Sequence, residues 1–109
     1  MDEMSQIEAL RQQIVEQFQS ERIIFFGSYA YGEPNEDSDV DLLVVMPFEG
    51  HSPRKVAEIW FQVRPRFPLD LLVRTPGLLR QRLEMGDFFM KEIVDEGKML
   101  YEAPDSGMD

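Results

Sequence analysis

The stretch that decides the fold runs from residue 22 to residue 46 and reads RIIFFGSYAYGEPNEDSDVDLLVVM. Residues 22–26 are β-branched and aromatic and stop at Gly27, which is typical of a buried strand. Residues 32–38 are rich in turn formers and predict an exposed loop. Residues 39–46 predict a second strand, ended by a proline. The stretch therefore predicts two strands, with a turn and a short helix directly after the first.

The sequence on either side of this stretch alternates between helical and strand patterns. Apolar residues at helical spacing predict an amphipathic helix over residues 3–18, and residues 69–74 predict a third strand. Further predictions are helices from Pro53 to about residue 63, over 76–83 and over 88–96, and an edge strand at 98–101. Helices alternating with strands indicate an α/β fold, with flanking helices on a mixed sheet of three to four strands.

Length and composition predict a single domain. The 109 residues are 43% hydrophobic and contain no cysteine, so one core without disulfides or Cys-ligated zinc is expected. We assign residues 1–103 to this domain and residues 104–109 to a flexible tail. No apolar run approaches the roughly 20 residues that span a bilayer, and the N-terminus is acidic where a signal peptide is basic. We expect a cytoplasmic protein that does not bind membranes.

The net charge of −10 argues against stable binding of duplex nucleic acid, which relies on a basic surface. The charge is uneven, since residues 54–82 carry seven basic and two acidic residues, a balance of +5. The rest of the chain is therefore at −15. This basic segment fits phosphates or an acidic partner, or else it forms solvated helix faces.

Asp39 and Asp41 are the first candidates for chemistry. They are two residues apart on a predicted strand, so both side chains leave the same face and repel one another. A divalent cation would remove this conflict, and oxygen ligands without nearby His or Cys favour Mg²⁺ or Mn²⁺. The alternative is that Asp39 caps a loop and Asp41 lies at a solvated strand end.

Gly27 and Ser28 form the second candidate feature. At the end of a buried strand, a small residue allows backbone to approach a phosphate, which free N–H groups and a hydroxyl can bind. Asp70 adds a third carboxylate on another predicted strand, where an unpaired carboxylate is costly unless it reaches solvent at the strand edge. A phosphate cradle and metal ligands are thus expected at adjacent strand ends.

With these residues in view, GSYAYGEPNEDSDVDLLV at residues 27–44 resembles the GSx10DxD signature of the polymerase-β nucleotidyltransferase superfamily, in particular its minimal nucleotidyltransferase (MNT) branch. The resemblance covers roughly residues 22–101 and implies a polymerase-β-like nucleotidyltransferase core. It implies that Asp39, Asp41 and Asp70 are the metal ligands and catalytic residues for two Mg²⁺ ions. Gly27 and Ser28 would bind the triphosphate of ATP or another nucleotide.

The sequence departs from a common version of this signature at two positions. Tyr29 and Tyr31 stand where arginine is often found, which removes two phosphate-pairing charges. Arg74 or another member of the basic segment compensates, or the tyrosine rings stack on a base or pack in the core.

The resemblance also suggests a partner. MNT proteins are commonly encoded beside HEPN-domain toxins and act as their antitoxins, some by transferring AMP from ATP to a toxin tyrosine. It therefore implies a Mg²⁺-dependent protein adenylyltransferase and a hetero-oligomer. Two alternatives stay open: a non-catalytic antitoxin or nucleotide-binding module that neutralises its partner by contact, and nucleotidyl transfer to a small molecule.

Overall fold

Helices and strands alternate along the chain in the computed structural model, which describes residues 3–28, 30–32 and 39–104. Most of the predicted loop at 32–38 and of the predicted tail at 104–109 lies outside these residues. The elements are, in order, α1 (Glu3–Gln17), β1 (Arg22–Phe26), β2 (Val40–Val45), α2 (Ser52–Val63), β3 (Leu69–Arg74), α3 (Pro76–Glu84), α4 (Phe88–Glu96) and β4 (Lys98–Glu102). The α/β fold predicted from the sequence is confirmed.

The four strands form one mixed sheet in the order β3-β2-β1-β4. β1 runs antiparallel to both β2 and β4, whereas β2 and β3 are parallel. A parallel pair needs a crossover connection, and α2 provides it. The short C-terminal strand predicted from the sequence is therefore the edge strand β4, next to β1.

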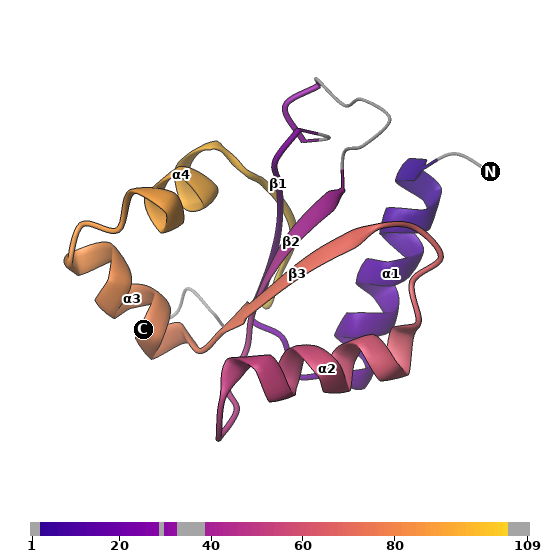
Figure 1. The fold of residues 1–109 in the computed structure, drawn as a ribbon, viewed down its shortest axis with the longest axis horizontal. Helices are drawn as coiled ribbons and strands as arrows, with labels where there is room; N and C mark the ends of the chain where they lie inside the picture. The colour runs from indigo at the N-terminus through magenta and orange to yellow at the C-terminus, as the bar shows by residue number, and fades with distance from the viewer. Residues whose placement is uncertain (1–2, 29, 33–38, 105–109) are drawn as a thin grey trace.

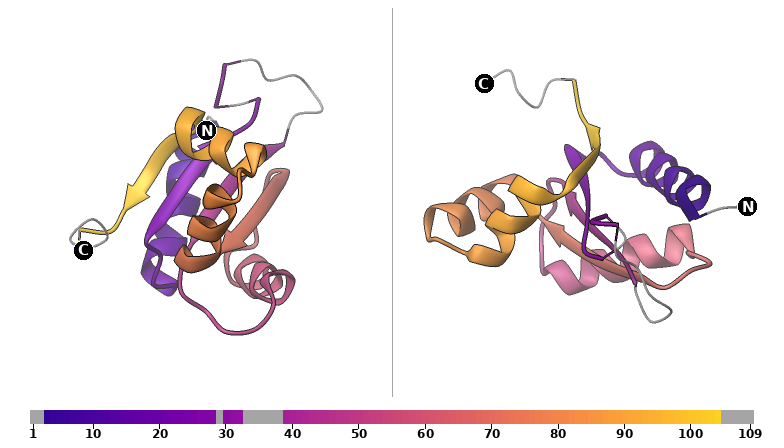
Figure 2. Two further views of the ribbon diagram at one scale, coloured as in Figure 1. Left: turned by 90° about the vertical axis from the view of Figure 1, so that its left-hand side faces the viewer. Right: turned by 90° about the horizontal axis from the view of Figure 1, so that it is seen from above.

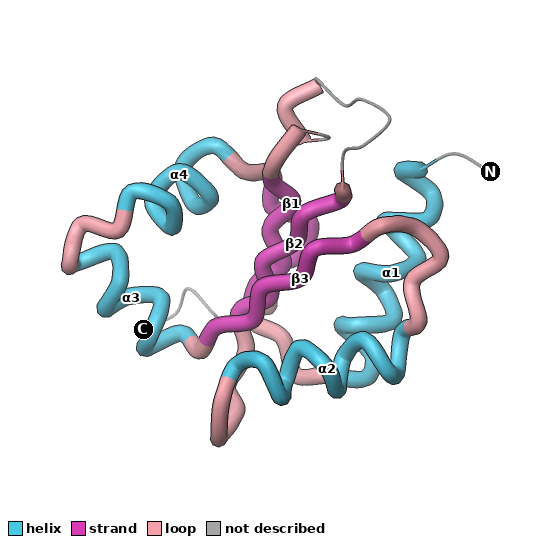
Figure 3. Tube along the Cα trace, in the orientation of Figure 1, coloured by secondary structure: helices cyan, strands magenta, loops and turns pink. Residues whose placement is uncertain are grey.

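The helices cover both faces of the sheet. Figure 1 shows α1 and α2 on one side and α3 and α4 on the other, and the view from above in Figure 2 shows the same separation. Coloured by secondary structure in Figure 3, the chain has the sheet between two helical layers. Alternate residues of β2 follow this division: Leu42 and Val44 pack in the core under α1 and α2, while Leu43 and Val45 pack under α3 and α4.

Capping residues in the sequence fix where α3 and α4 begin, on the face of the sheet that these two helices cover. Thr75 Oγ1 accepts a hydrogen bond from the N–H of Leu78 at 3.1 Å, and Pro76 occupies the first position of α3. Asp87 Oδ1 accepts one from the N–H of Met90, also at 3.1 Å. Each such cap contributes about 1 kcal/mol to helix stability.

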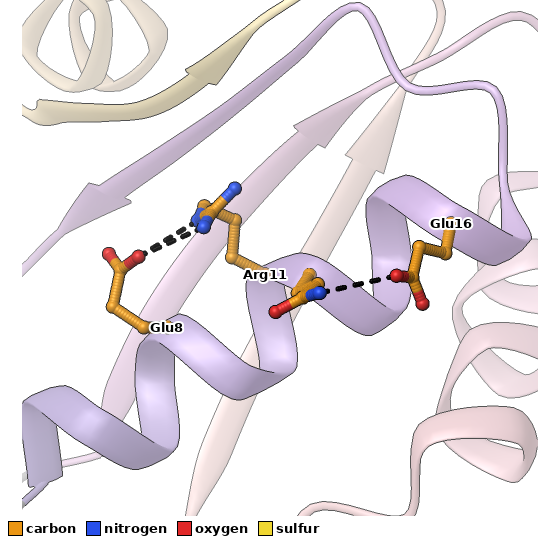
Figure 4. A network of polar contacts seen from close by, with 4 residues as sticks. Glu8, Arg11 and Glu16 are labelled. Carbon is orange, nitrogen blue, oxygen red and sulfur yellow. Dashed lines mark hydrogen bonds and ion pairs between the residues drawn. The ribbon is translucent and has the colours of Figure 1, made fainter.

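On the other face, two polar contacts join side chains of α1. Figure 4 shows the Arg11 guanidinium on the Glu8 carboxylate at 3.0 Å and the Gln12 amide on Glu16 at 3.2 Å. These contacts join side chains three and four residues apart along the exposed side of the helix. Its opposite side is buried against the sheet. None of the helices that the structure describes is long and apolar enough to span a bilayer.

Two predictions about the central stretch are wrong in detail. No helix follows β1 among the described residues 27, 28 and 30–32, which form turns. The Tyr31 N–H donates to the Gly27 carbonyl at 3.1 Å, so a single helical turn forms there. The second strand begins at Val40 rather than at Asp39, because Val40 makes the first hydrogen bond toward β3, from its N–H to the Pro68 carbonyl at 2.9 Å.

Candidate active site

The sheet topology brings the predicted site residues to one end of the sheet, where β1 ends and β2 and β3 begin. β1 is antiparallel to β2 and β3 is parallel to it, so the end of β1 meets the starts of β2 and β3. In the register, Asp41 lies opposite Phe26 on one side and opposite Asp70 on the other. Gly27 and Ser28 directly follow Phe26. Three segments far apart in the sequence thus meet around Asp41.

Gly27 packs directly against the Asp41 carboxylate. A Cβ added at Gly27 would collide with Asp41 Oδ2. Gly27 also has a φ of +83°, which non-glycine residues rarely adopt. Both observations explain why the small residue predicted to admit a phosphate is a glycine: the backbone turns sharply here and passes close to a carboxylate.

Asp41 and Asp70 form a hydrogen-bonded pair of carboxyl groups. The pKa of Asp41 is raised from 3.8 to about 6, first by burial, then by the charge of Asp70, by the hydrogen bond that protonated Asp41 donates to Asp70, and by the charge of Asp39. Two adjacent carboxylates resist simultaneous ionisation, so one proton stabilises the pair. A divalent cation placed between them would take over that role.

Asp39 lies near this pair, one residue before β2. Its side chain is exposed, and it precedes the first residue of β2, so it influences Asp41 through its charge. Across residues 3–28, 30–32 and 39–104, no three acidic, histidine or cysteine side chains lie close enough together to form a metal site. The pair Asp41 and Asp70 still fits Mg²⁺, which is often held by one or two carboxylates together with substrate phosphates. The donor set consists of oxygen atoms, as this ion prefers.

Tyr31 lies beside the same edge. A backbone hydrogen bond from Gly27 reaches its hydroxyl, and burial together with the charge of Glu92 raises its pKa despite that bond. Glu96 and Asp41 add smaller effects in the same direction. The acidic residues of α4 near the site were not predicted, because nothing in the local sequence of α4 indicates which part of the sheet it covers. Tyr29 lies outside the described residues.

Arg74 does not compensate for the missing arginines at this edge. It is the last residue of β3, opposite Val45, whereas Asp70 is near the start of that strand. Its guanidinium donates to the carbonyl of the neighbouring Val73 at 2.8 Å. His51, interpreted from the sequence as a loop residue, is the exposed N-cap of α2 and makes no side-chain cap bond.

Comparison with known proteins agrees with this geometry. The family model described as nucleotidyltransferase domain matches residues 7–101, which include all the elements around the carboxylate pair. The chain belongs to the nucleotidyltransferase domain family. Its general chemistry is therefore the transfer of a nucleotidyl group to an acceptor.

A solved structure supports both the fold and the family. This nucleotidyltransferase domain is similar to a protein from Sulfolobus solfataricus, whose 1.40 Å crystal structure is described as that of a candidate nucleotidyltransferase. The two share 25% sequence identity over 72% of this chain and 71% of the other, with a TM-score of 0.50. No curated protein matches the chain.

Within this nucleotidyltransferase domain, polar groups of two kinds lie side by side. The turn at Gly27 and Ser28 has a backbone N–H and an exposed hydroxyl, which are groups that can bind a phosphate. The adjoining carboxylates have oxygen atoms of the kind that can bind a cation or accept a proton.

Proposed function

We propose that the protein transfers AMP from ATP to a tyrosine hydroxyl of a HEPN-domain toxin in a Mg²⁺-dependent reaction, and so acts as its antitoxin. The observation that carries the proposal is the hydrogen-bonded pair of Asp41 and Asp70 packed against Gly27. This places two carboxylates directly beside a turn that can admit phosphates. Membership of the nucleotidyltransferase family supplies the reaction type.

Each residue has a defined task in this proposal. Gly27 and Ser28 bind the triphosphate, while Asp39, Asp41 and Asp70 would hold the metal and thereby orient the phosphates. Bound Mg²⁺ would neutralise the triphosphate and the pyrophosphate that leaves. Asp70 accepts the proton of the acceptor hydroxyl, whose oxygen forms a bond to the α-phosphorus as the bond to pyrophosphate breaks.

The pairing of Asp41 with Asp70 suits this division of tasks. In the metal-free protein Asp41 holds a proton below about pH 6, because its pKa is raised to about 6. A cation held by the pair would replace that proton, and the carboxylate of Asp70 would then accept a hydrogen bond from the acceptor. Asp70 has an exposed side chain, so an acceptor can approach it from solvent.

A protein acceptor is supported by the resemblance of residues 27–44 to the signature of the MNT branch. In this proposal the acceptor is a separate molecule that binds to the surface of the nucleotidyltransferase domain. The resemblance to MNT antitoxins names a HEPN-domain toxin as that molecule.

The test uses the purified chain with a purified HEPN-domain toxin and Mg²⁺. ATP labelled at the α-phosphate is expected to transfer its label to a tyrosine of the toxin and to abolish toxin activity, whereas ATP labelled at the γ-phosphate transfers none. Inhibition without label would instead support neutralisation by contact. Label on an added aminoglycoside but not on the toxin would support a small-molecule acceptor.

A further inference from the structure

A groove of about 780 Å³ lies between α1 and the segment that joins α2 to β3. In Figure 1 this segment passes beside α1 before it enters the sheet. Side chains of α1 form one wall, and residues 62–67 form the other. Apolar groups such as Leu10 and Phe67 line its depth, so it is suited to a polypeptide segment.

The groove has an unusual charge for this protein. The chain has 21 acidic residues and a net charge of −10, yet none of the acidic residues that the structure describes lines the groove. Its charged groups are Arg64 and Arg66, and its remaining polar groups are the amides of Gln6, Gln13 and Gln62. Both arginines have exposed side chains. The groove is therefore a local site of positive potential on a negative molecule.

Arg64 is held in a left-handed conformation that is common at the end of a helix but that a non-glycine side chain does not favour. It follows the last residue of α2 with a φ of 45°, and it is the one non-glycine residue with positive φ in the described part of the chain. Glycine adopts this conformation without steric cost. The Arg64 guanidinium lies 5.9 Å from the centre of the Phe61 ring, and its Nε donates to the Phe61 carbonyl at 3.3 Å. The side chain is thus oriented by its own helix.

The groove lies near the candidate active site along the chain but on the other face of the sheet. Phe67 is three residues before Asp70, so their Cα atoms are at most about 10 Å apart. Leu69 and Leu71 pack in the core under α1 and α2 (Figure 1), so Asp70 between them faces the side of α3 and α4. A partner that lies in the groove would therefore reach the carboxylates with a neighbouring segment that passes around the edge strand β3.

We propose that this groove docks an acidic segment of the acceptor protein on the sheet face opposite the carboxylates; the inference rests on the proposed protein acceptor. Two guanidinium groups bind carboxylates of the segment, the glutamine amides bind its backbone, and the apolar depth takes one or two of its side chains. An acidic partner is repelled by the rest of the protein surface and is attracted at this groove, which gives the docking its direction.

A polypeptide fits this surface better than a nucleic acid. Binding of a phosphate backbone needs many basic contacts along its length. This groove has two basic groups, Arg64 and Arg66, and the chain outside residues 54–82 carries a charge of −15. A nucleic acid extending from the groove would therefore meet negative surface, whereas a short acidic segment ends within it.

The experiment measures binding of a fluorescent peptide of alternating glutamate and tyrosine, in the absence of nucleotide. We expect salt-sensitive binding, weakened at least about tenfold by Arg64→Glu with Arg66→Glu. The matched control is Arg80→Glu with Arg82→Glu, which makes the same charge change on the exposed side of α3 and should leave binding close to that of the wild type. The same peptide with glutamine in place of glutamate should bind weakly.

Arg64→Gly separates docking from folding. This variant relieves the positive φ, so its melting temperature should equal or exceed that of the wild type, while its peptide affinity falls. Equal peptide binding by the wild type and the Arg64→Glu, Arg66→Glu variant overturns the proposal, as does equal binding of the glutamine peptide or no binding at all. Tighter binding of single-stranded oligothymidylate at the two arginines overturns it in favour of nucleic acid.

The binding measurement also keeps this proposal apart from the proposed function. Transfer of AMP to the intact toxin with no contribution from Arg64 and Arg66 would contradict the docking site alone. Peptide binding that depends on these arginines, without AMP transfer to any protein, would contradict the proposed function alone.

Discussion

The carboxylate of Asp41 fills the space beside the Cα of Gly27. The two residues come from the end of β1 and the start of β2, and their contact closes the turn at Gly27 and Ser28 onto the carboxylate pair. A side chain at position 27 would have to displace the Asp41 carboxylate. The geometry of the site therefore depends on the absence of one methyl group.

Gly27→Ala should destabilise the protein more than Gly86→Ala does. Both glycines have a φ of +83°, but a Cβ at Gly86 has no atom within 4 Å. The backbone cost, about 1 kcal/mol, is common to both variants. The collision with Asp41 should add about 1–3 kcal/mol for Gly27→Ala alone. Urea unfolding of both variants measures the difference, and equal losses would show that Asp41 moves aside freely.

The stability of the metal-free protein should depend on the ionisation of Asp41. Its pKa is raised on folding, so the folded state holds this proton more tightly than the unfolded chain. The resulting stabilisation is fully present below pH 3.8 and is lost as the pH rises to about 6. Asp41→Asn should remove this dependence, so that the variant gains stability relative to the wild type across this window. Unfolding free energies measured in parallel between these pH values should therefore diverge, and parallel curves would contradict the raised pKa.

Asp39→Asn combined with Asp41→Asn should abolish nucleotidyl transfer and leave the fold intact, or more heat-stable without metal, because it removes like charges as well as cation ligands. Mg²⁺ should raise the melting temperature of the wild type more than that of this double variant, since a ligand stabilises the state that binds it. The measurements are label transfer and thermal unfolding with and without Mg²⁺. An equal rise in both proteins would refute the metal assignment, and loss of folding would indicate a structural role.

Asp70→Asn should lower the transfer rate by at least about 10²-fold, the lower range for a positioned acid–base group. Nucleotide affinity should fall less, because Ser28, Asp39 and Asp41 still hold the triphosphate and its cation. Measuring affinity and single-turnover rate on the same variant distinguishes the roles. Unchanged transfer would make Asp70 a bystander, and equal loss of both would make it a nucleotide-binding or structural residue.

The elements of the fold could be predicted because their signals are local. A β-branched run ending in Gly27, a proline after a threonine cap at Thr75, and a terminal glycine at Gly97 act within a few residues of themselves. The assembly of Gly27, Asp41 and Asp70 at one edge also followed from the sequence, since strand ends were expected to meet.

The details of the site depend on long-range packing and could not be predicted in this way. The hydrogen bond between Asp41 and Asp70 requires the parallel register of β2 and β3, which no local pattern specifies. Arg74 was a candidate for the phosphate site, yet the length of β3 places it at the opposite end of this strand from Asp70. The helix expected after Gly27 is a single turn among the described residues, because two glycines five residues apart favour turns there.

The crossover through α2 has a consequence for the order of folding. Asp41 and Asp70 are ordinary, separate carboxyl groups until β3 aligns beside β2, and the two antiparallel pairings of β1 do not need that step. Alignment of β3 is therefore the moment at which two negative charges are forced together. We expect the refolding rate of the metal-free chain to fall as the pH rises through the titration of Asp41, with the slowest phase in alignment of the β2–α2–β3 unit. Repulsion between Asp41 and Asp70 would then slow the folding of the metal-free chain.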